Sequence, residues 1–354
     1  MKTNKFICLA LLAGLFMFLF PTYSMAEDSG ETLGYAVTAV PSGKQIDTTK
    51  TYFYIQTTPG EEQELVVKVK STQKDPVKIK VRIEDAFTGD KGTLEYTADK
   101  KLLDSTLTDP LSSIVKVENP SITVEDFEEV EAKFTLTPPK ESYPGVKMGV
   151  LVFELDEEDD SVVGNGFAYR IGFIASETGE DYENSQTLNL LDAKSEIVRG
   201  KKMILATLQN PEPKVLSRLA MTADLKNVKT GKIVKQVQGE KYVLAPNSRF
   251  NFEMDWGTSD IVAGTYMLSI VAKSPYSDWK FEKEFTITGD QASSMNEQSA
   301  FKIITPTWIK VVTIICLIVM VSVTGMLLVR RKKMEAEWER RRKRRKRKKK
   351  KEGK

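Results

Sequence analysis

The sequence predicts a mainly β protein with two tandem sandwich domains and one transmembrane helix. Three observations support this prediction: short runs of alternating apolar and polar residues, a 19-residue apolar run near the C-terminus, and a cysteine-free stretch between two hydrophobic segments. Alternation with a period of two is typical of strands that bury one face of a sheet. A chain of 354 residues has room for two such domains once targeting segments are removed.

The N-terminus has the pattern of a secretory signal peptide over residues 1–26. Two lysines precede an apolar core over residues 6–20, and Ser24-Met25-Ala26 supplies the small residues of a cleavage site. The apolar core is short for a membrane span and ends at Pro21. This favours cleavage after Ala26 over an N-terminal anchor.

The first sandwich is predicted over residues 33–156. Residues 77–83 alternate apolar and charged side chains, as does the second half of residues 64–70. Short strands at this spacing favour an antiparallel, immunoglobulin-like sandwich. We expect Phe53, Phe134 and Phe153 in its core. Further candidate strands are residues 52–57, 130–137 and 146–155.

The second sandwich is predicted over residues 166–289, with the same immunoglobulin-like character. An acidic run, Asp156–Asp160, separates the two blocks, and five adjacent acidic residues indicate a solvated linker or hairpin tip. The run lacks the spaced ligands and the glycine of a calcium-binding loop, so a calcium site is the less favoured alternative. The candidate strands of this block are residues 168–174, 197–198, 203–208, 216–225, 233–237, 250–256, 265–272 and 279–288.

A polar segment over residues 290–307 predicts a stalk, which can include a short helix, and a transmembrane helix is predicted over residues 309–329. The apolar run of 19 residues covers roughly 28 Å at 1.5 Å per residue, which matches the hydrocarbon core of a bilayer. Trp308 lies just before it, where an aromatic ring suits the membrane interface. The stalk contains no Leu-Pro-x-Thr-Gly sorting signal, so the helix is expected to be the permanent anchor.

Charge changes sign across this helix. The basic tail, residues 330–354, holds 17 Lys or Arg against 4 Glu, whereas residues 27–309 hold 32 basic against 45 acidic residues. Because basic flanks stay in the cytoplasm, this predicts a single-pass type I protein of the cell membrane, with an extracellular ectodomain and a cytoplasmic tail. Twelve consecutive basic residues, Arg340–Lys351, favour anionic membrane lipids over nucleic acid as the partner of the tail.

Residue usage excludes most catalytic chemistry. The chain has no histidine, which removes Ser-His-Asp catalysis and the commonest zinc ligand. Its two cysteines, Cys8 and Cys316, lie in hydrophobic segments, and a disulfide-free ectodomain is typical of a Gram-positive surface. Paired carboxylates can hydrolyse glycans, but no motif singles out a pair. We therefore expect no enzyme, no catalytic residues, no metal and no cofactor.

Aromatic residues are the best candidates for ligand contact, because their faces stack on sugar rings and anchor protein interfaces. For each of them the alternative is that the ring fills the core. The candidates are Tyr52, Tyr54, Tyr96, Tyr143, Trp256 and Trp279.

Several short motifs, taken in order, resemble the WxL-interacting proteins of Gram-positive bacteria. In the first block they are Tyr35–Pro41, Gln45-Ile46, Tyr52-Phe53, Pro59-Gly60, Gly92-x-x-x-Tyr96 and Pro144-Gly145. In the second block they are Leu208–Pro211, Ala245–Ser248, Ala263-Gly264-x-Tyr266, Trp279-x-Phe281 and Phe285–Gly289. The chain departs from the family at Ser71-Thr72, where an Asn is usual, and at Met148-Gly149, where a Gly-Gly pair is common.

The resemblance implies a peptidoglycan-binding first domain and a host-binding second domain. It implies a non-enzymatic scaffold that holds WxL-domain surface proteins at the wall, with host extracellular proteins as a further class of partner. Two alternatives stay open. One is an envelope sensor that signals through the basic tail, and the other is a wall-modifying enzyme, which the missing histidine disfavours.

Overall fold

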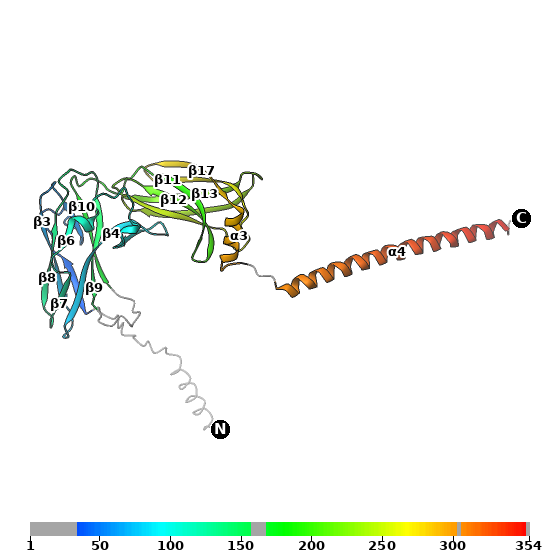
Figure 1. The fold of residues 1–354 in the computed structure, drawn as a ribbon, viewed down its shortest axis with the longest axis horizontal. Helices are drawn as coiled ribbons and strands as arrows, with labels where there is room; N and C mark the ends of the chain where they lie inside the picture. The colour runs from blue at the N-terminus through cyan, green and yellow to red at the C-terminus, as the bar shows by residue number, and fades with distance from the viewer. Residues whose placement is uncertain (1–33, 157–167, 303–305, 352–354) are drawn as a thin grey trace, which may run out of the picture. The chain divides into compact units, whose positions relative to one another are not determined.

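The computed structural model describes residues 34–156, 168–302 and 306–351. The predicted signal peptide and residues 157–160 of the acidic run lie outside this part of the chain. The described chain is mainly β, as predicted (Figure 1). Contacts divide it into two compact units. The larger extends to Lys194 and includes 205–254 and 266–285, and the smaller comprises 195–204, 255–265 and the chain from Thr286 onward.

Two layers of mainly antiparallel strands form the first sandwich (Figure 1). One sheet has the strand order β1-β3-β8-β6; the other has the order β2-β10-β9-β4-β5, with β7 also paired to β4. The strands are β1 (Tyr35–Ala39), β2 (Phe53–Gln56), β3 (Gln63–Ser71), β4 (Val77–Thr88), β5 (Leu94–Thr97), β6 (Val115–Val117), β7 (Ser121–Val124), β8 (Glu129–Leu136), β9 (Lys147–Leu155) and β10 (Ala168–Ser176).

The core of this sandwich follows from the period of two. Leu65, Val67 and Val69 of β3 are buried, while the lysines between and after the valines face solvent. Across the layer gap, the rings of Phe134 and Phe153 meet edge-on with centroids 6.2 Å apart. Fully burying a side chain of this size stabilises by about 1.5–3 kcal/mol. The prediction that these two rings and Phe53 fill the core is confirmed.

Strand β10 belongs to the first sandwich and not, as expected, to the second. It pairs antiparallel with β9, from Ala168 opposite Glu154 to Ala175 opposite Lys147, and parallel with β2. Phe173 is fully buried, with its ring centroid 5.6 Å from that of Phe53. The core of the first sandwich therefore requires β10.

Four strands and two short helices of this sandwich were not predicted. Strands β1, β5, β6 and β7 have only three to five residues each. Strands of this length are too short to show an alternation with a period of two. The helices η1 (Lys100–Leu102) and α2 (Leu111–Ile114) are each a single turn.

Seven strands form the second pair of sheets. One sheet has the order β11-β12-β15 and the other the order β14-β13-β16-β17. The rings of Tyr242 and Phe252, one from each sheet, lie 5.9 Å apart. The strands are β11 (Asn189–Val198), β12 (Lys201–Asn210), β13 (Leu216–Asn227), β14 (Ile233–Leu244), β15 (Ser248–Asp255), β16 (Gly264–Lys273) and β17 (Asp278–Ile287).

Within the larger unit, the two sandwiches share a junction. Buried Met148 and Ile174 of the first sandwich cluster with Val215 and Ala245 of the second. Backbone hydrogen bonds cross the same seam: the Val243 amide donates to the Gly92 carbonyl at 2.8 Å, and the Val146 amide donates to the Pro213 carbonyl at 2.9 Å. The junction therefore has an apolar centre with hydrogen-bonded margins.

The predicted stalk begins with a packed helix, α3 (Gly289–Gln298), in the smaller unit. Thr288 and Gln291 form a reciprocal capping box that starts it. Ala292 and Met295 are buried, and the Asn296 side chain bonds both backbone groups of Ile261. This part of the segment therefore forms a short packed helix.

A single helix, α4 (Thr307–Lys351), contains the predicted span (Figure 1). Its segment Val311–Lys343 is long and apolar enough at its start to cross a membrane. Each side chain of α4 that the structure describes is exposed, as expected of a helix that contacts lipid. The helix continues well beyond the apolar run, through the basic tail.

Candidate functional site

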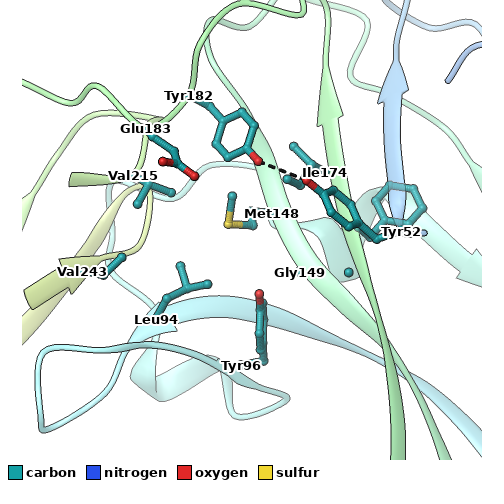
Figure 2. Close-up of a pocket in the computed structure, with 12 residues that line it drawn as sticks. Tyr52, Leu94, Tyr96, Met148, Gly149, Ile174, Tyr182, Glu183, Val215 and Val243 are labelled. Carbon is teal, nitrogen blue, oxygen red and sulfur yellow. Dashed lines mark hydrogen bonds between the residues drawn. The ribbon is translucent and has the colours of Figure 1, made fainter. Parts of the chain in front are cut away.

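A cavity of about 260 Å³ opens at the junction of the two sandwiches and is called here the tyrosine pocket (Figure 2). Its walls come from four places: the sheet face formed by β5, β9 and β10, the residue Tyr52 just before β2, the segment that leads from β10 to β11, and two valines of the second sandwich. The lining residues are Tyr52, Leu94, Tyr96, Met148, Gly149, Gly172, Phe173, Ile174, Tyr182, Glu183, Val215 and Val243.

Three phenols stand around this cavity. Figure 2 shows the Tyr96 hydroxyl pointing into the space below Met148, and the Tyr52 and Tyr182 hydroxyls turned toward each other. Those two oxygens lie 3.5 Å apart, at the limit of a hydrogen bond. A loose pair of this kind can exchange its bond for one to a ligand hydroxyl or amide.

Burial sets the charge state of the phenols. It raises the pKa of Tyr96, and burial followed by the hydrogen bond to Tyr52 raises the pKa of Tyr182. Both side chains therefore stay neutral at any physiological pH and keep their hydroxyl protons. The pocket offers hydrogen-bond donors without charge.

The rest of the lining divides into an apolar floor and one acid. Met148, Val215 and Val243 present methyl and thioether groups to the cavity, while Glu183 places a carboxylate at its upper wall (Figure 2). Aromatic faces, apolar patches and a few acceptors together fit an uncharged ring that carries hydroxyl and amide groups. An acetylated sugar has this chemistry.

The structure brings together two of the six sequence candidates, Tyr52 and Tyr96, in this pocket. Tyr54 does not line it. Its ring is buried and packs edge-on against Tyr182 at 5.5 Å, so it supports the pocket from behind. Tyr143 is also buried, with its hydroxyl 2.8 Å from that of Thr57, and burial raises its pKa to about 12.

The two tryptophans lie away from the pocket lining. The Trp256 indole donates to the Asp260 carbonyl at 3.3 Å in the smaller unit. Trp279 is half-buried on β17, the end strand of its sheet. Neither residue lines the tyrosine pocket.

Sequence patterns missed Tyr182, Glu183, Val215 and Val243. Residues 182 and 183 lie in an irregular polar segment, and the valines sit near strand ends where alternation gives no sign of a junction. Met148-Gly149 was noted only as a departure from the family pattern. In residues 34–156, 168–302 and 306–351, no group of three or more Asp, Glu, Cys or His side chains could hold a metal ion.

Comparison with solved structures finds distant β proteins. The YadV chaperone aligns at 12% identity over 72% of this chain and 100% of its own, with a TM-score of 0.28. The class 5 fimbriae chaperone CfaA aligns at 9% identity over 70% and 98%, with a TM-score of 0.27. The CupB2 chaperone of Pseudomonas aeruginosa aligns at 14% over 65% and 95%, with a TM-score of 0.27.

Family comparison is more specific, although no curated protein matches the sequence. Residues 35–154 match the peptidoglycan binding domain of the WxL Interacting Protein, and residues 158–297 match its host binding domain. These are binding domains, in the order that the sequence motifs predicted, and they indicate a surface binding or adhesion role. The chain belongs to the WxL Interacting Protein family.

Proposed function

We propose that this protein is a non-enzymatic scaffold of the cell surface. Helix α4 holds it in the membrane with the ectodomain outside and the basic tail inside, next to anionic lipids. The ectodomain binds peptidoglycan and recruits WxL-type surface proteins, and its second domain adds contacts to host components. The charge asymmetry on either side of the apolar run supports this orientation.

The observation that carries the proposal is the tyrosine pocket, to which the peptidoglycan-binding segment contributes Tyr52 and Tyr96 and the host-binding segment contributes Tyr182. Peptidoglycan glycans consist of acetylated sugar rings, which suit neutral phenols beside an apolar floor. The pocket draws residues from both sandwiches. Wall binding therefore depends on the junction as well as on the first domain.

Peptidoglycan sedimentation tests this proposal. The full-length protein, held in uncharged detergent micelles, is incubated with purified peptidoglycan and centrifuged. We expect the wild type in the pellet and the double variant Tyr52→Ala/Tyr96→Ala mostly in the supernatant. Tyr276→Ala is the matched control, since Tyr276 does not line the pocket and its hydroxyl bonds Arg218 instead. A wild type that stays in solution would overturn the proposal.

Recruitment of surface proteins is proposed to use strand pairing. End strands such as β17 and β1 present one unpaired row of backbone groups, onto which an extended partner segment can add. Immobilised full-length protein should retain a WxL protein from the same cell. If the immobilised wild-type protein does not retain the WxL protein, that result counts against a scaffold role.

The sensor alternative makes a different demand on the tail. Deleting residues 340–354 while keeping Arg330–Lys333 leaves the flank that fixes orientation. A scaffold should still retain its partners in cells that carry this deletion. A sensor would lose its output.

A further inference from the structure

A second cavity, called here the charged cleft, has a volume of about 350 Å³ and different chemistry. It lies in the larger unit between the end of β4, the turn η1, and exposed positions of β11, β12 and β15. Its charged lining residues are Asp90, Lys101, Asp192, Lys194 and Arg249. Basic residues outnumber acidic ones here, although the ectodomain as a whole is acidic.

Arg249 is held in place by a buried acid. The Asp104 side chain is only 1% exposed, and its Oδ2 lies 3.7 Å from the Arg249 Nε. That oxygen makes no hydrogen bond within the described chain. An unsatisfied buried carboxylate oxygen is costly, so its position opposite a guanidinium calls for an explanation.

The other Asp104 oxygen is saturated. Oδ1 accepts from the Thr106 backbone amide at 2.9 Å, from the Thr106 hydroxyl at 2.7 Å and from the Gln209 side-chain amide at 2.9 Å. These bonds fix the carboxylate, so Oδ2 can only face Arg249. Because Asp104 meets Nε, the terminal nitrogens of the guanidinium remain for a group in the cleft.

The facing walls complete a polar lining. The Thr207 hydroxyl donates to the Asn251 side-chain carbonyl at 2.8 Å. The side-chain nitrogen of Asn251 takes no part in that bond and can donate to a ligand. Lys101 is exposed at the cleft, on a turn that Asp99 caps by accepting from the Lys101 amide at 3.0 Å. A cation from each sandwich therefore borders the same space.

We propose that the charged cleft binds an anionic group, a carboxylate or a phosphodiester, carried on a polar chain. Arg249 and Lys101 receive the anion, and Asn251 donates to it or to a neighbouring oxygen. Asp90 and Asp192 accept hydrogen bonds from hydroxyl or ammonium groups of the same ligand. This site is separate in lining and in chemistry from the tyrosine pocket, and it goes beyond the proposed wall binding at that pocket.

Binding of two labelled probes tests the proposal at 50 mM NaCl. One probe is a short glycerol phosphate oligomer, and the other is an acetylated tripeptide with a free C-terminal carboxylate. The full-length protein in uncharged detergent is titrated with each probe, and fluorescence anisotropy gives the affinity. Because the basic tail binds anionic probes as well, every variant is also titrated with residues 340–354 deleted, and the affinities of these tail-deleted proteins are the ones compared.

At least one probe should bind about tenfold more weakly to Arg249→Gln, as expected for loss of a charge-assisted pair. Lys133→Gln is the control, because Lys133 pairs with Glu64 on an exposed surface of the first sandwich. Its affinity should stay within about twofold of the wild type. The probe that responds identifies the source of the anion.

Folding is checked separately. If Arg249→Gln lowers the unfolding temperature, Lys101→Gln replaces it, since Lys101 is exposed and its side chain makes no hydrogen bond or ion pair within the described residues. We expect that variant to weaken binding about threefold. Equal affinities of the wild type and both variants for both probes would overturn the proposal, as would no binding at all. Retained peptidoglycan sedimentation in the same variants would show that the tyrosine pocket acts independently.

Discussion

The tyrosine pocket and the charged cleft occupy the same compact unit, and each takes residues from both sandwiches. One is lined by neutral phenols, apolar side chains and a single carboxylate, and the charged residues of the other are three basic and two acidic. The difference shows that the junction can offer two unlike binding chemistries from one seam. A polymer that carries both sugar rings and anionic groups would meet both.

The largest effect is expected from breaking the seam that the two sites share. Gly145 has φ +65°, and a Cβ there would collide with the Pro213 carbonyl. Gly145→Ala combines left-handed strain with overpacking, so the free energy of unfolding should fall by roughly 2–5 kcal/mol. Thermal unfolding measured by circular dichroism checks this.

Gly43→Ala is the matched control, since a Cβ at Gly43 would meet nothing within 4 Å. It should leave the unfolding temperature unchanged. If the seam is shared, Gly145→Ala should weaken binding at both sites together. Loss at one site alone would show that they are separate in structure as well as in chemistry.

Crossed substitutions sharpen the comparison next. Tyr96→Ala removes a stacking face and a donor, and we expect peptidoglycan affinity to fall about tenfold, in line with an anchor aromatic. The same variant should bind the anionic probe as the wild type does. Arg249→Gln should give the reverse pattern. The affinities of both variants for both ligands show whether the two sites act separately. Equal losses of affinity for both ligands in both variants would indicate a general loosening of the junction.

Raising the salt concentration should change the affinities of the two sites to different extents, and by smaller factors than the substitutions do. Raising NaCl from 50 to 500 mM shortens the Debye length from about 14 Å to about 4 Å, so binding at the charged cleft should weaken several-fold. The tyrosine pocket presents no cation, and its binding should change by less than twofold. Parallel titrations of the two ligands test this. A tyrosine pocket whose affinity falls strongly with salt would contradict its assignment as a site for an uncharged ring.

Local patterning predicted the regular strands well. In β3, in the first half of β4 and in β13, the strand buries one face of a sheet, so the period of two appears directly in the residue order. The placement of β10 could not be predicted, because alternation says which face is buried and not which strand is the neighbour. The fold places β10 between β9 and β2 by long-range pairing.

The candidate site shows the same limit. Tyr52 and Tyr96 stood out because aromatic residues are few and chemically versatile. Tyr182 and Val243 did not, because their part in the pocket arises only where the two sandwiches touch. Arg249 was hidden for a related reason: the acid that holds it, Asp104, is 145 residues earlier in the chain.

The smallest effect concerns pH, and it separates ligand binding from stability. Burial raises the pKa of the pocket phenols Tyr96 and Tyr182, so peptidoglycan binding should stay constant between pH 6 and 9. Stability should then decline in strong alkali. Burial raises the pKa of Tyr35 and Tyr143 to about 12 in the folded protein, against about 10 in the unfolded chain.

The sign follows from proton binding. Below pH 10 these two tyrosines are neutral in both states, and their full contribution to stability is present. Between pH 10 and 12 the unfolded chain releases their protons while the folded chain keeps them, so the free energy of unfolding falls as pH rises. Urea unfolding at pH 8, 10 and 11.5 measures this. Tyr143→Phe, which cannot ionise, should reduce the alkaline loss, and an unchanged slope in that variant would show that the loss originates elsewhere.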